Sequence, residues 1–256
     1  MQLEDYINRE LAQPEKNILL MTHIVLGYPS MQVNRQVVAA MVDNGVELIE
    51  MQIPFTEPVA DGPAIVRANQ ASIENGISVK DAFVFAQEMT KKHPIAFLFM
   101  TYYNIVLQYG AEKFCSDAKK IGIKGVIIPD LPPEEGDSFF DLARSYDLDP
   151  ILVFAPTSTP ERMTRLNQSA SGFIYCVARK GVTGQKTDFD TTFNDYMAQC
   201  RAATGLPLAV GFGIASKDDI DRLNGKADIG VIGTRTINLV DELGVDAVGP
   251  FIAGLR

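Results

Sequence analysis

Eight short apolar segments recur along the chain, and segments with helical periodicity separate them. The apolar segments cover residues 18–26, 48–53, 95–100, 125–128, 151–154, 172–177, 206–210 and 229–232. They are rich in Ile, Val, Leu and Phe and alternate little between apolar and polar residues, which is typical of parallel strands covered on both faces. The pattern therefore predicts eight buried strands.

Apolar stripes with helical spacing lie between these segments. They are clearest at residues 37–42, 114–121 and 193–200, where apolar side chains recur every three or four residues. Ser78, Thr159 and Ser216 each precede a helical segment, and we expect them to act as N-caps.

Eight strand–helix units predict a (β/α)₈ TIM barrel, formed as a single domain over residues 1–256. A doubly wound open sheet is the alternative. It usually has fewer strands, and the residues after the first strand, Leu26-Gly27-Tyr28-Pro29, do not match the dinucleotide-binding fingerprint. The second βα connection is unusually long, because residues 63–76 precede a helix at 79–92. Long loops on the C-terminal face of a barrel usually build the active site.

The composition narrows the function classes. A chain of 256 residues with 46% hydrophobic content is long enough for one large core. The net charge is −9 and no run of Lys or Arg exceeds two residues, which argues against a nucleic-acid surface. No segment reaches the roughly 18 apolar residues of a membrane helix, and the first residues do not resemble a signal peptide. Three widely spaced cysteines without a CxxC pair indicate reduced core residues. We expect a soluble cytoplasmic protein.

Two carboxylates stand out around the second strand. Glu50 shares one strand face with Leu48 and Gln52, whereas Ile49 and Met51 share the other. The fully apolar face suits the layer against the helices, so Glu50 is expected to point into the barrel. Burial favours its protonated form, as in a general acid or base. A structural Glu paired with Lys or Arg is an equally open interpretation.

Asp61 lies in the long loop that follows, immediately before Gly62. An Asp before Gly is common turn chemistry, so Asp61 by itself would be structural. Its position after Glu50 favours a role of Asp61 at the active site, because this loop is able to close over a ligand that Glu50 contacts.

Glycines follow each of the last three predicted strands, at 181–184, 211–213 and 233. Glycine lets backbone N–H groups approach an anion closely, and barrels often bind phosphate after strands seven and eight. Each motif alone is compatible with a plain turn. Together they predict a phosphorylated small molecule as the ligand.

No metal site is predicted. The only two histidines, His23 and His93, lie far apart in sequence. His93 ends a predicted helix, where we expect it to be solvated, and His23 either faces the barrel interior or is a hydrogen-bonded core residue. No Lys lies within a predicted strand, which argues against Schiff-base chemistry. Catalysis by carboxylates, without a cofactor, is the remaining prediction.

Six segments resemble, in order along the chain, the signature of the tryptophan synthase α-subunit family. They are residues 26–29 (LGYP), 50–63 (EMQIPFTEPVADGP), 129–132 (PDLP), 179–184 (RKGVTG), 211–214 (GFGI) and 233–234 (GT). The resemblance spans nearly the whole chain. It implies a (β/α)₈ barrel that cleaves indole-3-glycerol phosphate to indole and glyceraldehyde 3-phosphate in a retro-aldol reaction. It also implies an α₂β₂ complex with a pyridoxal-phosphate-dependent β subunit, which uses the indole for L-tryptophan biosynthesis, and no cofactor in this chain.

The resemblance also implies roles for individual residues. Glu50 matches the family's acid/base, and Asp61 matches the group at the indole nitrogen. The phosphate cradle is matched by Gly184, Gly213, Gly233 and Thr234. Residues around the substrate are matched by Tyr102, Ile127, Tyr175 and Phe212, and Thr183 matches a residue that meets the second catalytic carboxylate when its loop closes.

Five positions depart from the family's commoner pattern. Gln52 replaces a Gly on the same face as Glu50, so its amide is expected either to bond Glu50 or to crowd the indole. His23 replaces an apolar aromatic residue at the indole end, so both side chains are expected to line the substrate. Val25 stands where Thr is common, and Glu57 replaces an Asp on the loop that faces the β subunit. Arg235 replaces a small residue beside the phosphate loop, where its charge would reinforce anion binding.

Two other functions remain open. The departures at residues 23, 25 and 52 are compatible with a non-catalytic subunit that only activates the β subunit. Another phosphate-binding barrel, an isomerase or an epimerase, is the third possibility. The absence of predicted metal ligands and the arrangement of Glu50 and Asp61 argue against it.

Overall fold

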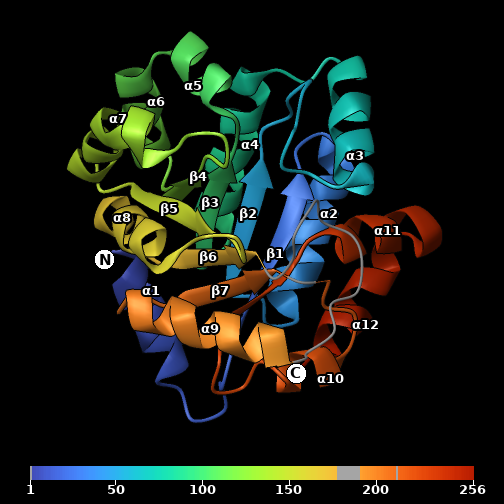
Figure 1. Ribbon diagram of the computed structural model, residues 1–256. Helices are drawn as coiled ribbons and strands as arrows, with labels where there is room; N and C mark the ends of the chain where they lie inside the picture. Colours follow the sequence, from blue (N-terminus) through green and yellow to red (C-terminus); the bar gives the residue numbers. More distant parts are fainter. Residues whose placement is uncertain (1, 178–190, 212) are drawn as a thin grey trace.

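A closed barrel of eight parallel strands forms the centre of the computed structural model, which describes residues 2–177, 191–211 and 213–256. The strands pair in chain order, and the last pairs with the first. They are β1 (Leu19–Val25), β2 (Leu48–Gln52), β3 (Ala96–Met100), β4 (Gly125–Ile127), β5 (Asp149–Phe154), β6 (Ile174–Val177), β7 (Leu208–Gly211) and β8 (Ile229–Ile232). Figure 1 shows them surrounded by helices. All eight predicted strands are confirmed, and the open sheet is excluded.

The helices include three that begin at predicted N-caps. They are α1 (Leu3–Leu11), α2 (Met31–Asp43), α3 (Pro63–Glu74), α4 (Val79–Lys92), α5 (Tyr103–Tyr109), α6 (Ala111–Lys120), α7 (Pro133–Ser145), α8 (Pro160–Ser169), α9 (Thr191–Ala203), α10 (Lys217–Asp221), α11 (Thr234–Leu243), the 3₁₀ helix η1 (Val245–Ala247) and α12 (Val248–Ala253). Ser78 and Ser216 each form a reciprocal capping box, and the Thr159 side chain accepts from the third residue of α8. The three predicted caps are confirmed.

The strands separate two apolar layers. Outward-facing residues such as Ile49, Met51 and Ile53 pack with the helices in one cluster. Inward-facing residues such as Leu48 pack with side chains from the other strands inside the barrel. Because side chains alternate along a strand, Glu50 and Gln52 share the inward face of β2 with Leu48. The predicted orientation of Glu50 is confirmed.

Helix α1 closes the end of the barrel at which the strands begin. Its Leu3, Tyr6 and Ile7 are buried in the inner cluster. The backbone N–H of Leu3 donates to Asp149 Oδ2 at 3.1 Å, and the hydroxyl of Tyr6 donates to the carbonyl of Glu47 at 3.0 Å. This end is filled by apolar side chains, so a substrate site belongs at the opposite end.

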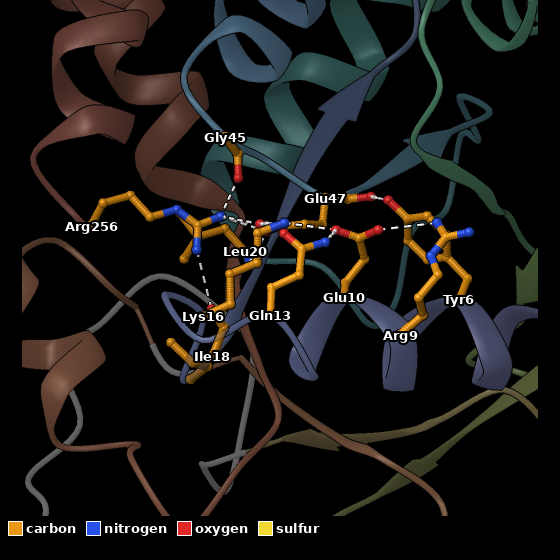
Figure 2. Close-up of polar contacts among 10 residues, drawn as sticks. All are labelled: Tyr6, Arg9, Glu10, Gln13, Lys16, Ile18, Leu20, Gly45, Glu47 and Arg256. Carbon is orange, nitrogen blue, oxygen red and sulfur yellow. Dashed lines mark hydrogen bonds and ion pairs between the residues drawn. The ribbon is translucent and has the colours of Figure 1, made fainter.

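A buried carboxylate ties distant parts of the chain together at the same end (Figure 2). Glu47, which immediately precedes β2, accepts from the backbone N–H of Leu20 at 2.8 Å. It also forms ion pairs with Lys16 at 3.1 Å and with Arg256 at 2.5 Å. The last residue of the chain is thereby fastened to the start of β1 and β2. Nothing in the sequence pattern singled out Glu47.

His93 and the cysteines occupy buried positions. His93 ends α4 and is only 8% exposed, so the expected solvated position is wrong. Burial of its ring, together with the nearby charge of Lys92, lowers its pKa. Cys115, Cys176 and Cys200 are buried free thiols within the outer cluster, as expected from their spacing.

Candidate active site

Glu50 is paired with a histidine inside the barrel. The register of β1 and β2 places His23 directly beside Glu50, and His23 Nδ1 lies 2.8 Å from Glu50 Oε1. Both residues are buried, at 3% and 4% exposed. The ion-pair partner found for Glu50 among the described residues is this imidazole, not the Lys or Arg of the structural interpretation. His23 thus combines the two alternatives left open for it, because it faces the barrel interior and is a buried, hydrogen-bonded histidine.

The charge of Glu50 governs the protonation of His23. Burial by itself acts to lower the pKa of His23, because a charged imidazole loses hydration. The Glu50 carboxylate and its hydrogen bond act in the opposite direction, with smaller contributions from Asp61 and Gln52, and together they raise the pKa above its ordinary value. The buried imidazole therefore holds its proton more firmly than a solvated one.

Asp61 lies beside the same space, directly before α3. Its Oδ2 atom accepts from Gln52 Nε2 at 2.7 Å and from the Tyr102 hydroxyl at 3.0 Å. The Tyr102 oxygen in turn accepts from the backbone N–H of Ala60 at 3.1 Å, so the loop and the carboxylate share one anchor. Of the two alternatives for Gln52, the bond to Glu50 is not formed, because the amide nitrogen donates to Asp61. Crowding of the indole stays a prediction. The path of the loop, which cannot be read from strand periodicity, brings Asp61 within reach.

Opposing influences act on the Asp61 carboxyl group. Burial raises its pKa above the usual range. The positive charge expected on His23 and the hydrogen bonds from Gln52 and Tyr102 act to lower it, and the net result is still a raised pKa. Asp61 also borders an open groove of about 690 Å³ beside α3. It is thus a buried carboxyl group at the edge of solvent.

Aromatic and aliphatic side chains line the space around the two carboxylates. Tyr102, Ile127 and Tyr175 all belong to the inner cluster, and Phe55 stacks on Tyr102 with ring centroids 5.1 Å apart. Burial, together with nearby carboxylates, raises the pKa values of both tyrosines, so their phenols stay neutral. Gly211 leaves room for Tyr175, because a Cβ there would lie 2.9 Å from the tyrosine hydroxyl oxygen. The expected substrate residues Thr183 and Phe212 lie outside the described part of the chain.

The start of α11 has the features of an anion site. Gly233 is its N-cap, and Thr234, the first helical residue, has a buried hydroxyl without a hydrogen-bond partner among the described residues. Helix N-termini attract anions because their first N–H groups are free and the dipole is positive there. Gly213, with φ of +83°, follows β7, and the expected Gly184 lies outside the described residues. The backbone N–H groups of Ala215 and Ser216 at α10 already bind Asp219.

Two of the departures take positions that the family pattern does not suggest. The Arg235 guanidinium lies over the ring of Phe251, 5.7 Å from its centroid, and 3.7 Å from Glu242. These contacts direct the side chain along α11 toward α12, and the expected reinforcement of anion binding stays a prediction. Val25 packs with Ile65 and other apolar residues between β1, α3 and α11. The buried side chains of this cluster offer no hydrogen-bond partner to a threonine hydroxyl at this position.

Three buried polar residues hold the loops of this site, and the sequence interpretation missed them. Asn69 accepts from the backbone N–H of Phe55 at 2.9 Å, and Asn34 accepts from that of Gly27 at 2.7 Å. Ser72 donates to the carbonyl of Leu26 at 2.5 Å. Each lies on the buried face of its helix, so a polar residue within an apolar stripe was the available signal.

No group of three or more potential metal ligands occurs within residues 2–177, 191–211 and 213–256. In the same ranges, no helix has the length and apolar character needed to cross a membrane. The site as described consists of two carboxyl groups, an imidazole, an amide and two phenols around an interior space. Such a set is suited to moving protons within a bound molecule.

Comparisons with known proteins agree with this arrangement. The sequence model of the family described as "Tryptophan synthase alpha chain" matches residues 10–248. A tryptophan synthase alpha chain of Desulfotalea psychrophila is 63% identical over 242 residues, which cover 94% of this chain and 95% of that protein. One of Syntrophotalea carbinolica is 50% identical, with coverage of 99% and 100%.

Solved structures of this family have the same fold. A chain of Mycobacterium tuberculosis tryptophan synthase superimposes with a TM-score of 0.91 and 28% identity, covering 99% of this chain and 96% of that one. The tryptophan synthase α subunit of Legionella pneumophila gives a TM-score of 0.90 at 28% identity, with coverage of 100% and 97%. With the family model matched over most of its length, this chain belongs to the tryptophan synthase alpha chain family.

Proposed function

We propose that this chain cleaves indole-3-glycerol phosphate to indole and glyceraldehyde 3-phosphate, with Glu50 and Asp61 as its catalytic residues. The observation that carries the assignment of residues is the pair of carboxyl groups from β2 and the loop that follows it, both buried near Tyr175 of the inner cluster. They lie on the side of the barrel opposite α1, toward the ends of the strands, where barrels place their chemistry.

The two carboxyl groups have different tasks in this retro-aldol cleavage. Glu50 delivers a proton to C3 of the indole ring and takes the proton of the hydroxyl group on the adjacent glycerol carbon. The bond between these carbons then breaks, its electron pair returns to the ring, and the hydroxyl-bearing carbon becomes the aldehyde. Asp61 accepts the indole N–H and stabilises the positive charge that the ring carries after protonation. No net proton is consumed.

Hydrogen bonding within the site fits this division. Gln52 and Tyr102 both bind Oδ2 of Asp61, and among the described residues no donor is found at Oδ1. This oxygen is therefore available for the indole N–H. Tyr102, Ile127 and Tyr175 supply apolar walls for the ring, and we include Phe212, Thr183, Gln52 and His23 among the substrate contacts.

The phosphate group belongs at the ends of β7 and β8. We propose that Gly184, Gly213, Gly233 and Thr234 form its cradle. The N-terminus of α11 and the unpartnered hydroxyl of Thr234 support this position. Anchoring the phosphate here leaves the indole ring to extend toward Glu50 and Asp61.

We further propose that the chain works in an α₂β₂ complex with a tryptophan synthase β subunit in the cytoplasm. The family and the similarity to a chain of M. tuberculosis tryptophan synthase support a β-subunit partner. Pyridoxal phosphate belongs to that partner, and the proposed chemistry of this chain uses only its own side chains.

Replacement of each carboxyl group tests the assignment. We expect Glu50→Gln and Asp61→Asn each to lower indole formation by about 10²–10⁴-fold, the usual range for a lost general acid or base and for lost stabilisation of transition-state charge. Indole release from indole-3-glycerol phosphate is measured with and without the β subunit, and circular dichroism checks the fold. Glu135→Gln and Asp141→Asn, at exposed positions on α7, are the matched controls.

Three outcomes separate this function from its alternatives. Turnover retained in either carboxyl variant contradicts the assignment of residues. A wild-type chain that stimulates the β subunit but releases no indole is a non-catalytic activator. A chain that binds a simple sugar phosphate but not indole-propanol phosphate belongs to the isomerase or epimerase class.

A further inference from the structure

Two hydrogen-bonded pairs lie side by side in the barrel, one at each carboxylate. His23 Nδ1 bonds Glu50 Oε1, and Gln52 Nε2 bonds Asp61 Oδ2. His23 comes from β1, whereas Glu50 and Gln52 are successive inward-facing residues of β2. Because His23 pairs with Glu50 in the register, Gln52 lies one inward-facing position further along the neighbouring strand. The imidazole and the amide are therefore neighbours.

Each pair leaves one polar atom without a partner. Among the buried side-chain atoms of the described residues, His23 Nε2 and Gln52 Oε1 make no hydrogen bond. An amide oxygen only accepts, and an imidazole nitrogen donates when it carries a proton. These two buried groups are of complementary type and lie close together, but they do not bond each other in the structure. Leaving both unpaired is costly, which favours a hydrogen bond between them.

We propose that His23 is a positioning residue, a doubly protonated imidazole that joins Glu50 to the Gln52–Asp61 pair in one hydrogen-bonded chain. This inference rests on the proposed function for its catalytic meaning, but the protonation of His23 is testable without it. Only the doubly protonated ring is able to donate to Glu50 with Nδ1 and to Gln52 with Nε2. A neutral ring leaves one of these acceptors unmet.

Charge balance supports a cationic ring. The ionisable groups that act on His23 are the carboxylates of Glu50 and Asp61, and both favour its charged form. The phenols of Tyr102 and Tyr175, which lie near these carboxylates, stay neutral. Two carboxylates in a water-poor space repel each other, and an imidazolium ion between them reduces that repulsion.

The hydrogen-bonded chain from Glu50 through His23 to Gln52 and Asp61, here called the His23 bridge, also affects the reaction. His23 occupies Oε1 of Glu50, so Oε2 is left to exchange protons with the substrate. As a carboxylate, Glu50 first receives the hydroxyl proton of the substrate and then gives a proton to C3 of the indole in each turnover, and a fixed rotamer keeps it within reach of both sites. His23 acts through Glu50 in this scheme and forms no bond to the reacting carbon atoms.

Nuclear magnetic resonance of ¹⁵N-histidine-labelled protein tests the protonation directly. The chain contains only His23 and His93, so two imidazole patterns are expected, and a His93→Asn variant assigns them. We expect His23 to stay doubly protonated above about pH 6.5, the ordinary value for histidine, whereas His93 loses its proton below that pH. In Glu50→Gln, the His23 titration moves to lower pH and that of His93 stays in place. The unmoved His93 pattern also reports that this variant is folded.

A kinetic comparison tests the positioning role. His23→Gln keeps a neutral hydrogen-bonding group, and His23→Phe keeps an aromatic ring without one. Because both variants remove the cation, we expect the acidic limb of kcat/KM for indole formation to move to higher pH in each. A larger fall in kcat is expected for His23→Phe, which also loses the bond to Glu50.

The outcomes for the bridge and for the lyase function are distinguishable. A singly protonated His23 at pH 6.5 overturns the inference even if indole is formed. So does a His23 titration whose midpoint does not move in the Glu50→Gln variant. An unchanged pH profile in both His23 variants does the same. If His23 is doubly protonated and its titration depends on Glu50, but the chain forms no indole, the His23 bridge is supported and the proposed reaction is contradicted.

Discussion

Gln52 illustrates how one side chain sets the properties of a carboxyl group that is distant in sequence. Asp61 is buried, and burial raises its pKa. The amide N–H of Gln52 donates to Oδ2 and favours the charged form, so it limits this rise. The binding of an indole N–H needs an ionised acceptor, so Gln52 extends the pH range in which Asp61 works.

Replacement of Gln52 by methionine isolates this effect. Gln52→Met keeps the length of the side chain and removes the donor, so the pKa of Asp61 rises further. We expect the acidic limb of the pH profile of kcat/KM for indole formation to move to higher pH, with the largest loss of activity in acid. Gln87→Met, at an exposed position on α4, is the control. An acidic limb that stays in place or moves to lower pH contradicts this role.

At the scale of elements, the connection from β2 to α3 holds Asp61 through buried polar contacts. Asn69 of α3 accepts from the backbone N–H of Phe55, and its own amide donates to the carbonyl of Ile65 at 2.9 Å. Phe55 stacks on Tyr102, which bonds Asp61. The helix, the loop and the proposed catalytic carboxyl group are therefore linked into one rigid unit by these contacts.

Removal of the Asn69 side chain is expected to loosen this unit. Asn69→Ala leaves the Phe55 N–H without its acceptor, which costs about 1–3 kcal/mol of unfolding free energy. Since Asp61 loses part of its support, KM for indole-3-glycerol phosphate should also rise. Urea unfolding and steady-state kinetics measure the two effects. Gln70→Ala, at an exposed position on the same helix, is expected to stay within about 0.5 kcal/mol of the wild type; equal effects of the two variants would refute the proposal.

At the scale of the whole molecule, stability and chemistry lie at opposite ends of the barrel. The network of Glu47, Lys16 and Arg256 fastens the last residue of the chain to the starts of β1 and β2 (Figure 2). The proposed catalytic groups lie inside the barrel toward the other end. Changes in the network should therefore alter the free energy of unfolding and leave the reaction intact.

Arg256→Ala tests this separation. It removes a charged hydrogen-bonding partner from a buried carboxylate, and we expect a loss of about 1–3 kcal/mol in unfolding free energy. At temperatures where the variant stays folded, kcat and KM for indole formation should match the wild type. Lys119→Ala, which breaks an exposed ion pair with Asp147, should cost less. A changed kcat in folded Arg256→Ala would show that the two ends are coupled.

The periodicity of the chain determined much of this architecture by itself. The eight strands, the helical stripes, the three serine and threonine caps and the inward direction of Glu50 all follow from local rules. A strand alternates its side chains every residue, and a capping side chain bonds a backbone group three residues away. Such rules act over a few residues, so they can be read from the sequence without knowledge of the fold.

The partners of the functional side chains were decided only by the tertiary structure. His23 meets Glu50 because of the register between β1 and β2, and Gln52 meets Asp61 because the loop returns over the strand that it leaves. Arg235 turns toward Phe251, and Glu47 meets Arg256 across nearly the whole chain. These contacts depend on how the barrel closes and how its loops travel, and neither is encoded in local periodicity. The sequence thus determined the strands and the face that residues such as Glu50 occupy, and the closed barrel decided which residue lies opposite each of them.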